Sequence, residues 1–468
     1  MDVDPAFLAA HEDLVYELEN LGFVEREPGH WCGALTTPTG DNDVEVRFEY
    51  PYPMRPPRVK VPAFESTWHQ EVDGALCLWS ESSPGHFPWL EPGKLVAKVV
   101  EWIANTEAGW AGGTADLDLE RYWTQSTQYR LLILPDIGTI PEWIRLGHDQ
   151  NQKLLSYKGS DAPRHAKSRA TRHRNGYVVD IGEPPQPPRD WDGLAACLPN
   201  PDEVLELLQS RRVDVLVVRY SLAGEVGGFA LENAAQGRLQ PSLLGLPVAQ
   251  DTEDVRLLRS GHLASGLGDK TVAVVGVGSV GSFVADGLAR AGVRKLILID
   301  DGRLRPGHLP RHAARGPVGW RKVDAMAAML EPEIAINRVP TRVLDLDSAR
   351  NLLEVADCVV DATANEVTTE LLRLAAAEQG KQFVCTYLEN DGQDLIADVM
   401  PIESGAAHKS PQRQPLAGAG VESGCGDLVS PTAPYAVQEA ALMAVRVTLQ
   451  LLSVEAPPAR RIVREYSW

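Results

Sequence analysis

The glycine-rich stretch GVGSVG, residues 276–281, is the feature that most constrains the fold of this chain. The apolar run TVAVV before it has the length and β-branched content of a buried strand, and the residues after it, to about residue 291, predict a helix. KLILID at 295–300 predicts a second buried strand. The order strand, glycine loop, helix, strand predicts a βαβ unit in a parallel sheet.

The glycine loop is also the first candidate binding site. Gly276, Gly278 and Gly281 allow a tight turn and a close approach of the backbone to phosphates, and the helix N-terminus supplies free N–H groups. Asp300, at the end of the second strand, is predicted to accept hydrogen bonds from a ribose hydroxyl. The pattern predicts a nucleotide site, with a purely structural glycine turn as the alternative, and on its own it favours NAD over ATP.

The basic residues that follow favour a triphosphate instead. Residues 299–326 place four cations within reach of the same strand end, namely Arg311, Arg315, Arg321 and Lys322. Arg and Lys offset the charge of a polyphosphate, whereas an NAD site has little need for so many cations. The alternative is a basic surface loop.

The remaining C-terminal sequence continues the alternation of strands and helices. Short apolar strands are predicted at 358–363 and 382–388, and a long helix is predicted at 437–452. Residues 256–468 therefore predict a doubly wound α/β domain.

Residues 1–110 predict a domain of a different class, α+β. Residues 5–22 and 94–103 carry apolar side chains on one helical face, and DVEVRFEY at 43–50 alternates apolar and charged residues as a half-buried strand does. Cys77 lies between apolar neighbours in EVDGALCLWSE, residues 71–81. Taken alone, this pattern favours a buried and inert cysteine over a nucleophile.

The middle region, residues 111–255, carries no motif to which chemistry can be assigned. RLLILP at 130–135 and VDVLVVRY at 213–220 predict buried strands. The basic stretch between them, 153–176, lacks apolar periodicity and predicts a solvated loop, with a surface for an acidic partner as the alternative. The length of the chain fits about three domains, and we expect boundaries near residues 110 and 255.

Charge and cysteine usage exclude several classes of protein. The 468 residues carry a net charge of −19, which argues against a general nucleic-acid or membrane-surface binder. The N-terminus has no signal-peptide pattern, and no apolar run approaches the roughly 18 residues of a membrane span. The six cysteines, at 32, 77, 197, 358, 385 and 425, form no CxxC pair. We therefore expect a protein of the reducing cytoplasm without disulfides or structural zinc.

Residues 259–390 resemble the adenylation domain of ubiquitin-activating enzymes and their bacterial ThiF/MoeB-like relatives. The family patterns G-x-G-x-x-G, L-x-D-x-D, N-L-x-R, G-x-x-K and D-x-T-D-N correspond to GVGSVG, LIDDG, HLPR, GWRK and DATAN here. The resemblance implies Mg-ATP as cofactor, a ribose role for Asp300 and phosphate roles for Arg311 and Lys322. It further implies a homodimer through this domain, with Arg259 as the candidate arginine donated across the interface.

Two positions depart from the family pattern. The usual Asn of N-L-x-R is His308, and the acidic residue that handles magnesium in D-x-T-D-N is Ala364. Asp361 remains as a candidate metal ligand, and a structural role at the strand end is the equal alternative. If nothing replaces the missing acid, adenylation is expected to be slow or absent.

The N-terminal domain resembles ubiquitin-conjugating enzymes over residues 5–105. The stretches YPYPMRPPRVKVP, WHQEVDGALCLW and FPWLEPGKLVAKVVEWI follow the order Y-P-x-x-P-P-x-V-x-F, H-P-N, G-x-I-C-L, W-x-P and helix. In this register Cys77 is the acyl-accepting cysteine, a nucleophile that reacts as its thiolate. H-P-N becomes His69-Gln70-Glu71, so a carboxylate stands where an Asn normally helps to stabilise the oxyanion, and it would repel that charge unless it points away.

Cys425 is the candidate thioester cysteine of the activating half. It lies between two glycines in LAGAGVESGCGDLVSPTAP, residues 416–434, a composition typical of an accessible loop. Cys358 and Cys385 lie in apolar strands and are predicted to be structural. An incidental loop thiol is the alternative for Cys425.

Together the two halves resemble bacterial fusions of conjugating and activating enzymes, which occur in antiviral, CBASS-type operons. The resemblance implies adenylation of the C-terminal carboxylate of a carrier, transfer to Cys425, then to Cys77, and finally to a lysine amine of a target protein. The implied carrier is a cGAS-like nucleotidyltransferase or a ubiquitin-like protein. The alternatives are a sulfur-carrier adenylyltransferase of ThiF/MoeB type, an NAD-dependent oxidoreductase and a catalytically impaired scaffold.

Overall fold

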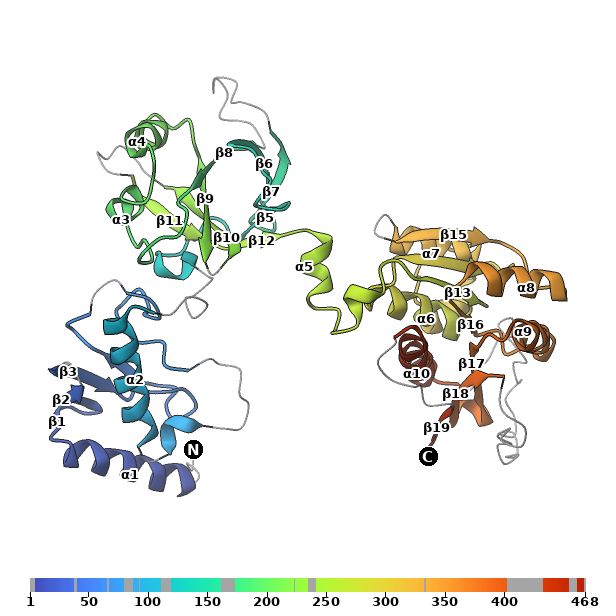
Figure 1. Cartoon of the computed structure of the whole chain (residues 1–468), viewed down its shortest axis with the longest axis horizontal. Coiled ribbons are helices and arrows are strands. Elements are labelled where there is room, and N and C mark those ends of the chain that lie inside the picture. The colour runs from blue at the N-terminus through green and yellow to red at the C-terminus, as the bar shows by residue number, and fades with distance from the viewer. Residues whose placement is uncertain are drawn as a thin grey trace. The chain divides into compact units, whose positions relative to one another are not determined.

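The structure is a computed structural model of the chain, and it divides into two compact units, Met1–Thr252 and Glu253–Trp468 (Figure 1). Each unit is described by itself. The structure describes residues 5–37, 40–64, 67–79, 87–91, 93–110, 119–160, 173–222, 224–234, 241–331, 334–401, 432–453 and 461–466.

The first part of the N-terminal unit is an antiparallel sheet, in the order β1-β2-β3-β4, that packs against two helices. The apolar face of β3 presents Val44 and Val46, and the helical face of α2 presents Leu95, Val99 and Ile103, to one buried core. The bounds are α1 Pro5–Asn20, β1 Val24–Glu27, β2 His30–Thr37, β3 Gly40–Arg47, β4 Arg58–Lys60, η1 Pro88–Leu90 and α2 Lys94–Ala108. The predicted helices and the predicted strand around 43–50 are therefore present.

The second part of the N-terminal unit is a mixed eight-stranded sheet in the order β11-β10-β9-β8-β6-β7-β5-β12. Two apolar clusters lie on its faces, one of them closed by Leu194 of α3 and by Val204 and Leu207 of α4. The bounds are η2 Leu119–Tyr122, β5 Leu131–Leu134, β6 Trp143–Asp149, β7 Leu154–Gly159, β8 His173–Asp180, α3 Trp191–Ala195, α4 Pro201–Gln209, β9 Val215–Leu222, β10 Glu225–Asn233, β11 Leu243–Leu246 and β12 Val248–Gln250.

The prediction of a solvated loop over 153–176 is wrong at both ends of that stretch. The first residues of the stretch form strand β7, and its last residues form the start of strand β8. Both strands pair with β6, one on each side of it. Backbone pairing to β6 satisfies the N–H and C=O groups of these strands, so their basic side chains do not prevent strand formation. The residues between β7 and β8, 161–172, lie outside the described part of the chain.

The C-terminal unit contains a seven-stranded sheet in the order β15-β14-β13-β16-β17-β18-β19. Its first five strands in that order are parallel, β18 pairs antiparallel to β17, and β19 pairs antiparallel to β18. The bounds are α5 Glu253–Leu257, η3 Ala264–Gly266, β13 Thr271–Val275, α6 Ser279–Arg290, β14 Lys295–Ile299, η4 Pro306–Arg311, α7 Lys322–Leu330, β15 Ala335–Val339, α8 Leu346–Val355, β16 Cys358–Asp361, α9 Glu366–Gln379, β17 Phe383–Glu389, η5 Asn390–Gly392, β18 Asp394–Met400, α10 Pro434–Leu452 and β19 Arg461–Glu465. The predicted βαβ unit and doubly wound α/β domain are confirmed.

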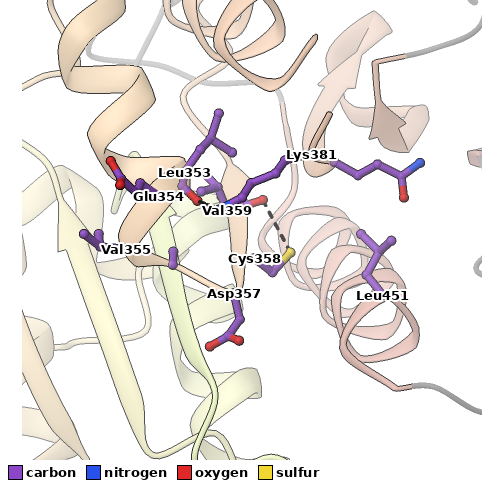
Figure 2. A pocket seen from close by; sticks show the side chains of 10 residues that line it. Leu353, Glu354, Val355, Asp357, Cys358, Val359, Lys381 and Leu451 are labelled. Atoms are coloured by element: carbon purple, nitrogen blue, oxygen red, sulfur yellow. Dashed lines mark hydrogen bonds between the residues drawn. The ribbon is translucent and has the colours of Figure 1, made fainter. Parts of the chain in front are cut away.

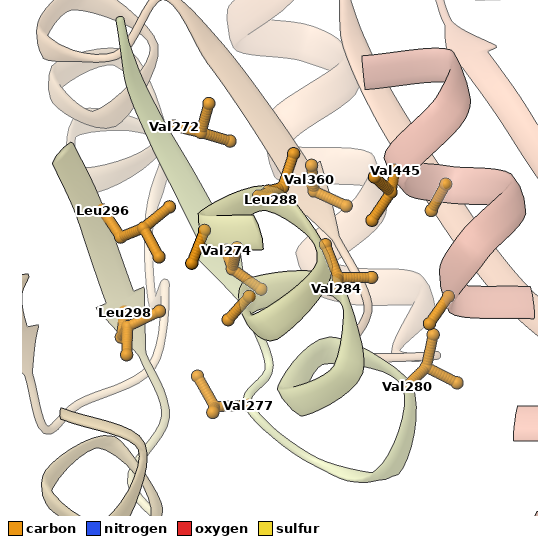
Figure 3. Packing of buried hydrophobic residues seen from close by; sticks show 14 of the residues in the cluster. Val272, Val274, Val277, Val280, Val284, Leu288, Leu296, Leu298, Val360 and Val445 are labelled. Atoms are coloured by element: carbon orange, nitrogen blue, oxygen red, sulfur yellow. The ribbon is translucent and has the colours of Figure 1, made fainter. Parts of the chain in front are cut away.

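Helices cover both faces of this sheet, because residues of β13 alternate between two cores. Val272 and Val274 face the cluster that includes Val284 of α6 and Val445 of α10, as Figure 3 shows. Their neighbours Ala273 and Val275 belong to the opposite cluster, beneath α8 and α9. A sheet buried on both faces explains why its strands read as continuous apolar runs in the sequence.

Among the helices of the described ranges, none combines the length and apolarity needed to cross a membrane.

Candidate functional site

The glycine loop begins at the point where the strand order of the C-terminal sheet reverses. Strand β13 lies between β14 and β16, and Val275 pairs with both Ile299 and Asp361. The carboxyl ends of the three strands are therefore level, and Gly276 and Asp300 follow directly from them. Such a topological switch point is where open α/β sheets bind their ligands.

Gly276 and Gly281 each satisfy a stereochemical requirement of this loop. Gly276 has a φ of +82°, and a Cβ there would lie 2.9 Å from the backbone of Thr363. A Cβ on Gly281 would lie 1.8 Å from the carbonyl oxygen of Gly276. Gly278 is the N-cap of α6, so the loop delivers a helix N-terminus to the switch point.

Asp300 ties the loop to the second strand. Its carboxylate accepts hydrogen bonds from the backbone N–H groups of Val277, at 2.9 Å, and Gly302, at 2.7 Å. Lys322, the first residue of α7, brings Nζ to 3.6 Å from Oδ2 of Asp300, and both side chains are about nine-tenths buried. A buried acceptor and a buried cation beside a glycine loop match the chemistry that ribose and phosphate groups require.

His312 holds the same loop from another side, and sequence reasoning missed it. Its Nε2 lies 3.1 Å from the carbonyl oxygen of Val277, and its Nδ1 accepts from the N–H of Ala314 at 3.1 Å. Nδ1 also lies 3.2 Å from the carbonyl oxygen of Ala314, so its proton position depends on the tautomer, and with the N–H of Ala314 as its donor the neutral ring carries the proton on Nε2. Burial lowers the pKa of His312, and the nearby Lys322 acts in the same direction. Because the imidazole carries no motif, only the fold reveals this contact.

Arg311 is half-buried at the end of η4 and directly precedes His312, which contacts the glycine loop. Arg259 is exposed and belongs to the segment that packs at the opposite, amino end of β14. There Glu253 pairs with Arg294 at 2.7 Å, and Gly292 lies against Ala264. This position takes Arg259 away from the glycine loop of its own chain.

Asp361 is almost completely buried, and its carboxylate is engaged by neighbouring side chains. It accepts from the backbone N–H and hydroxyl of Thr363, at 3.0 and 2.6 Å, and from the hydroxyl of Thr369 at 2.5 Å. Burial raises the pKa of this carboxyl group. The contacts favour the structural role at the strand end over magnesium ligation.

Ala364 and Asn365, at the positions directly after Thr363, carry no carboxylate. Ala364 adopts a φ of 51°, and Asn365 uses its side-chain oxygen to cap α9 through the N–H of Thr368. No group of three or more potential metal ligands occurs within the described ranges. These residues fit a nucleotide better than they fit a dedicated magnesium site.

Cys77 is half-buried and lies beside the 69–71 stretch. Its backbone N–H donates to the carbonyl oxygen of His69 at 2.8 Å, and its neighbour Leu76 is bridged to Gln70. The buried amide of Gln70 donates to the carbonyl oxygens of Phe64 and Gly74 at 2.8 and 3.1 Å. Gln70 therefore fixes the loop that presents Cys77.

The carboxylate of Glu71 is directed to a cation. Arg58 donates to Glu71 at 3.1 Å and to Asp73 at 2.5 Å. Burial lowers the pKa of Arg58, but Glu71 and Asp73 together outweigh it and raise that pKa overall. The negative charge that replaces the family Asn is thus paired.

Two arginines of the middle region, missed by sequence reasoning, also reach this site. Arg121 donates to Sγ of Cys77 at 3.3 Å, and Arg189 donates to backbone carbonyls of the 67–71 stretch. No periodicity or spacing connects residues so far apart in the chain. Cys77 lies in one unit and the glycine loop in the other.

Of the other cysteines, Cys32 and Cys197 are half-buried, Cys358 and Cys385 are buried, and one lies outside the described residues. Cys358 and Cys385 are buried as predicted, and burial raises the pKa of Cys358 to about 12. Cys358 lines a pocket of about 470 Å³ with Leu353, Lys381 and Leu451, shown in Figure 2. This pocket lies at the amino end of β16, away from the glycine loop. Cys425 lies outside the described residues.

With this geometry established, comparison with known proteins identifies the type of C-terminal domain. Residues 259–458 match the sequence model of the ThiF family. The chain is 46% identical over 66 residues to tRNA threonylcarbamoyladenosine dehydratase of Bacillus subtilis, covering 14% of this chain and 26% of that protein. It is 38% identical over 89 residues to ubiquitin-like modifier-activating enzyme 5 of Drosophila persimilis, covering 18% and 23%. Residues 259–458 therefore form a ThiF-family adenylation domain with homology to ubiquitin-activating enzymes.

A longer match is found to the uncharacterized protein y4qC of Sinorhizobium fredii. It is 28% identical over 251 residues, which is 46% of this chain and 41% of y4qC. The chain thus spans less than half the length of these curated relatives. Among solved structures, E. coli MccB matches with 16% identity and a TM-score of 0.35, covering 44% of this chain and 61% of MccB.

Proposed function

We propose that the protein activates the C-terminal carboxylate of a carrier protein with ATP and passes the acyl group through thioesters to an amine on a target. The observation that carries the proposal is that Gly276 and Asp300 follow level strand ends at the switch point of a ThiF-family domain, with buried Lys322 3.6 Å from Asp300. A relative named as a ubiquitin-like modifier-activating enzyme supports the same chemistry.

In the first step the glycine loop and the N-terminus of α6 hold the phosphates of ATP. Asp300 accepts a ribose hydroxyl, and Lys322 and Arg311 offset charge on the polyphosphate. A carboxylate oxygen of the carrier attacks the α-phosphorus, and the bond to the β-phosphate breaks, so pyrophosphate leaves. The product is an acyl-adenylate of the carrier.

The following steps exchange one acyl bond for another without oxidation or reduction. The Cys425 thiolate attacks the acyl carbonyl and AMP leaves, which gives the first thioester. The Cys77 thiolate then attacks that thioester, and the electron pair of the broken C–S bond leaves on Cys425. A lysine amine of the target finally displaces Cys77 and forms an amide.

The partners in this proposal are a carrier with a free C-terminus, target proteins and a second copy of the chain. A cGAS-like nucleotidyltransferase or a ubiquitin-like protein is the expected carrier, and antiviral defence of the CBASS type is the expected setting. The exposed position of Arg259, away from its own glycine loop, suits an arginine that acts in the partner copy. Magnesium stays a sequence-based prediction, because the hydrogen bonds of Asp361 do not fit the metal role.

Nucleotide binding tests the first step without a carrier. Calorimetric titration of the full chain with ATP and, separately, with NAD compares the wild type with Lys322→Ala. We expect ATP binding that weakens by about tenfold or more in Lys322→Ala, because a buried phosphate-binding cation is lost. Lys295→Ala, which removes an exposed lysine at the other end of β14, serves as the control. Binding of NAD in preference to ATP would contradict the proposal.

A further inference from the structure

The middle region contributes directly to the surroundings of Cys77. Arg121, in η2, places a guanidinium Nη2 at 3.3 Å from Sγ of Cys77. The next residue, Tyr122, is buried, and its hydroxyl accepts the backbone N–H of His69 at 3.0 Å. The carbonyl of His69 in turn accepts the N–H of Cys77. Short contacts therefore link η2 to both the thiol and the loop that holds it.

Arg189 fixes the opposite side of this contact. Its guanidinium donates to the carbonyl oxygens of Thr67, at 2.7 Å, and Glu71, at 3.1 Å, and it lies 4.7 Å from the ring centre of Tyr122. Trp68 adds a hydrogen bond to the carbonyl of Pro185. The loop of the first sheet is thus attached to the second sheet at several points, which gives Arg121 a defined position.

The side chain of Arg121 also borders open space. A pocket of about 330 Å³ is lined by Glu71, Val72, Asp73 and Arg121. Arg58 pairs with both carboxylates of this pocket, so their charges are offset within the N-terminal domain. Arg121 thus lines this pocket and also donates to Sγ of Cys77.

We propose that Arg121 is a catalytic residue of the Cys77 site, supplied by the middle region in place of the Asn that Glu71 replaces. The inference deepens the proposed function and rests on it for the identity of the reaction. The guanidinium stabilises the Cys77 thiolate before attack. When Sγ bonds to the thioester carbonyl, negative charge moves to the carbonyl oxygen, and the same guanidinium donates to it. As the tetrahedral intermediate collapses, that charge leaves with the departing thiolate.

Thiol alkylation tests this role without ATP, carrier or target. The full chain is treated with iodoacetamide across pH 5.5–9.5, and the labelling rate of Cys77 is followed by peptide mass spectrometry. We compare the wild type with Arg121→Gln, which keeps length and hydrogen bonding but removes the charge, and with Arg121→Lys, which keeps the charge. Arg130→Ala, an exposed arginine in the same region, is the matched control.

We expect Arg121→Gln to move the midpoint of Cys77 alkylation to higher pH and to slow the reaction at pH 7 by about threefold. The substitution should lower the thiolate fraction of Cys77 roughly tenfold, and the remaining thiolate, being more basic, is intrinsically more nucleophilic, which partly offsets this loss. Arg121→Lys should recover most of the wild-type profile, and Arg130→Ala should match it. Cys197, a half-buried thiol in the same unit, should keep its rate in every variant if the fold is intact.

Identical Cys77 profiles in the wild type and Arg121→Gln would overturn the inference. Faster labelling of Cys197 in Arg121→Gln would show that this substitution disturbs the fold. In that case Arg121→Lys decides: a wild-type Cys77 profile supports a role for the positive charge, and a profile like that of Arg121→Gln contradicts it. If the alkylation rate of Cys77 depends on the charge of residue 121 but Cys77 accepts no carrier, the proposed relay is refuted. The role of Arg121 at the thiol would still stand.

Discussion

The glycine loop takes its parts from one continuous βαβ unit and its neighbours, whereas the surroundings of Cys77 come from three stretches far apart in the chain. Gly276, Gly281 and Asp300 lie within 25 consecutive residues, at level strand ends. Cys77 instead receives Arg121 and Arg189 across the boundary between two sheets. The first site is encoded by local pattern and the second by tertiary packing.

This difference predicts unequal sensitivity to substitution. The glycine loop depends on a backbone geometry that leaves no room for a Cβ, so a single added carbon should disrupt the loop. The Cys77 site depends on several exposed or half-buried ion pairs, each of which is screened by solvent. The following predictions run from the largest expected effect to the smallest.

Gly281→Ala should have the largest effect. Its Cβ would lie 1.8 Å from the carbonyl oxygen of Gly276, so either the loop or α6 must move. We expect affinity for ATP to fall by about 100-fold and the midpoint of thermal unfolding to drop by several degrees. Gly268→Ala, where nothing lies within 4 Å of the added Cβ, is the control and should bind normally. Undiminished ATP binding in Gly281→Ala would refute the assignment of this loop.

His312→Ala should destabilise the C-terminal unit by about 2–3 kcal/mol at pH 7.5, because the buried carbonyl of Val277 loses its partner. Burial lowers the pKa of His312, so the folded protein favours the neutral ring. The stabilisation by His312 is therefore complete above the ordinary histidine range and declines as pH falls through it. Calorimetry from pH 7.5 to 5.5 should show the wild type and His312→Ala converging. A constant difference across that range would contradict a neutral, loop-holding His312.

Asp361→Asn distinguishes the two roles considered for this residue. As a structural group, Asp361 should tolerate the substitution with a change of about 1 kcal/mol in stability and an unaltered dependence of ATP binding on magnesium. Because burial raises the pKa of Asp361, its contribution to stability falls as pH rises above the ordinary carboxyl range, and the Asn variant lacks this trend. Titration of ATP at several magnesium concentrations provides the measurement. A tenfold change in the magnesium requirement would establish the metal role instead.

Arg58→Ala should have the smallest effect. Without Arg58 the carboxylates of Glu71 and Asp73 lose their nearest partner beside the thiol, so the alkylation of Cys77 at pH 7 should slow by about twofold. The difference should disappear in about 0.5 M salt, where charges on the surface are screened. Lys98→Ala, which removes a lysine paired on the surface of α2, should behave as the wild type at both salt concentrations.

The contrast between the two sites also explains what sequence could predict. The strands and helices of the C-terminal unit follow from apolar periodicity, since its sheet is buried on both faces. The loop glycines and Asp300 follow from a motif whose residues are neighbours in both sequence and space. The prediction of a loop at 153–176 is wrong at both ends because side-chain composition carries no sign that the backbone pairs with β6.

Residues that act through tertiary contacts left no comparable signal. His312 resembles any histidine in a basic segment until its ring is placed against the carbonyl of Val277. Arg121 and Arg189 lie 44 and 112 residues beyond Cys77 in a region that carries no motif. The departure at Glu71 was the one indication in the sequence that another group must serve Cys77.

The most direct test of the central claim is the intact mass of the protein, measured under non-reducing and mildly acidic conditions after incubation with Mg-ATP and candidate carriers. The wild type, Cys77→Ala and Cys425→Ala are compared in parallel. The relay predicts a thiol-labile adduct of carrier mass minus water, which remains on Cys425 in Cys77→Ala and is absent from Cys425→Ala. A carrier that is adenylated by the wild type but never forms a thiol-labile adduct would contradict the relay through Cys77.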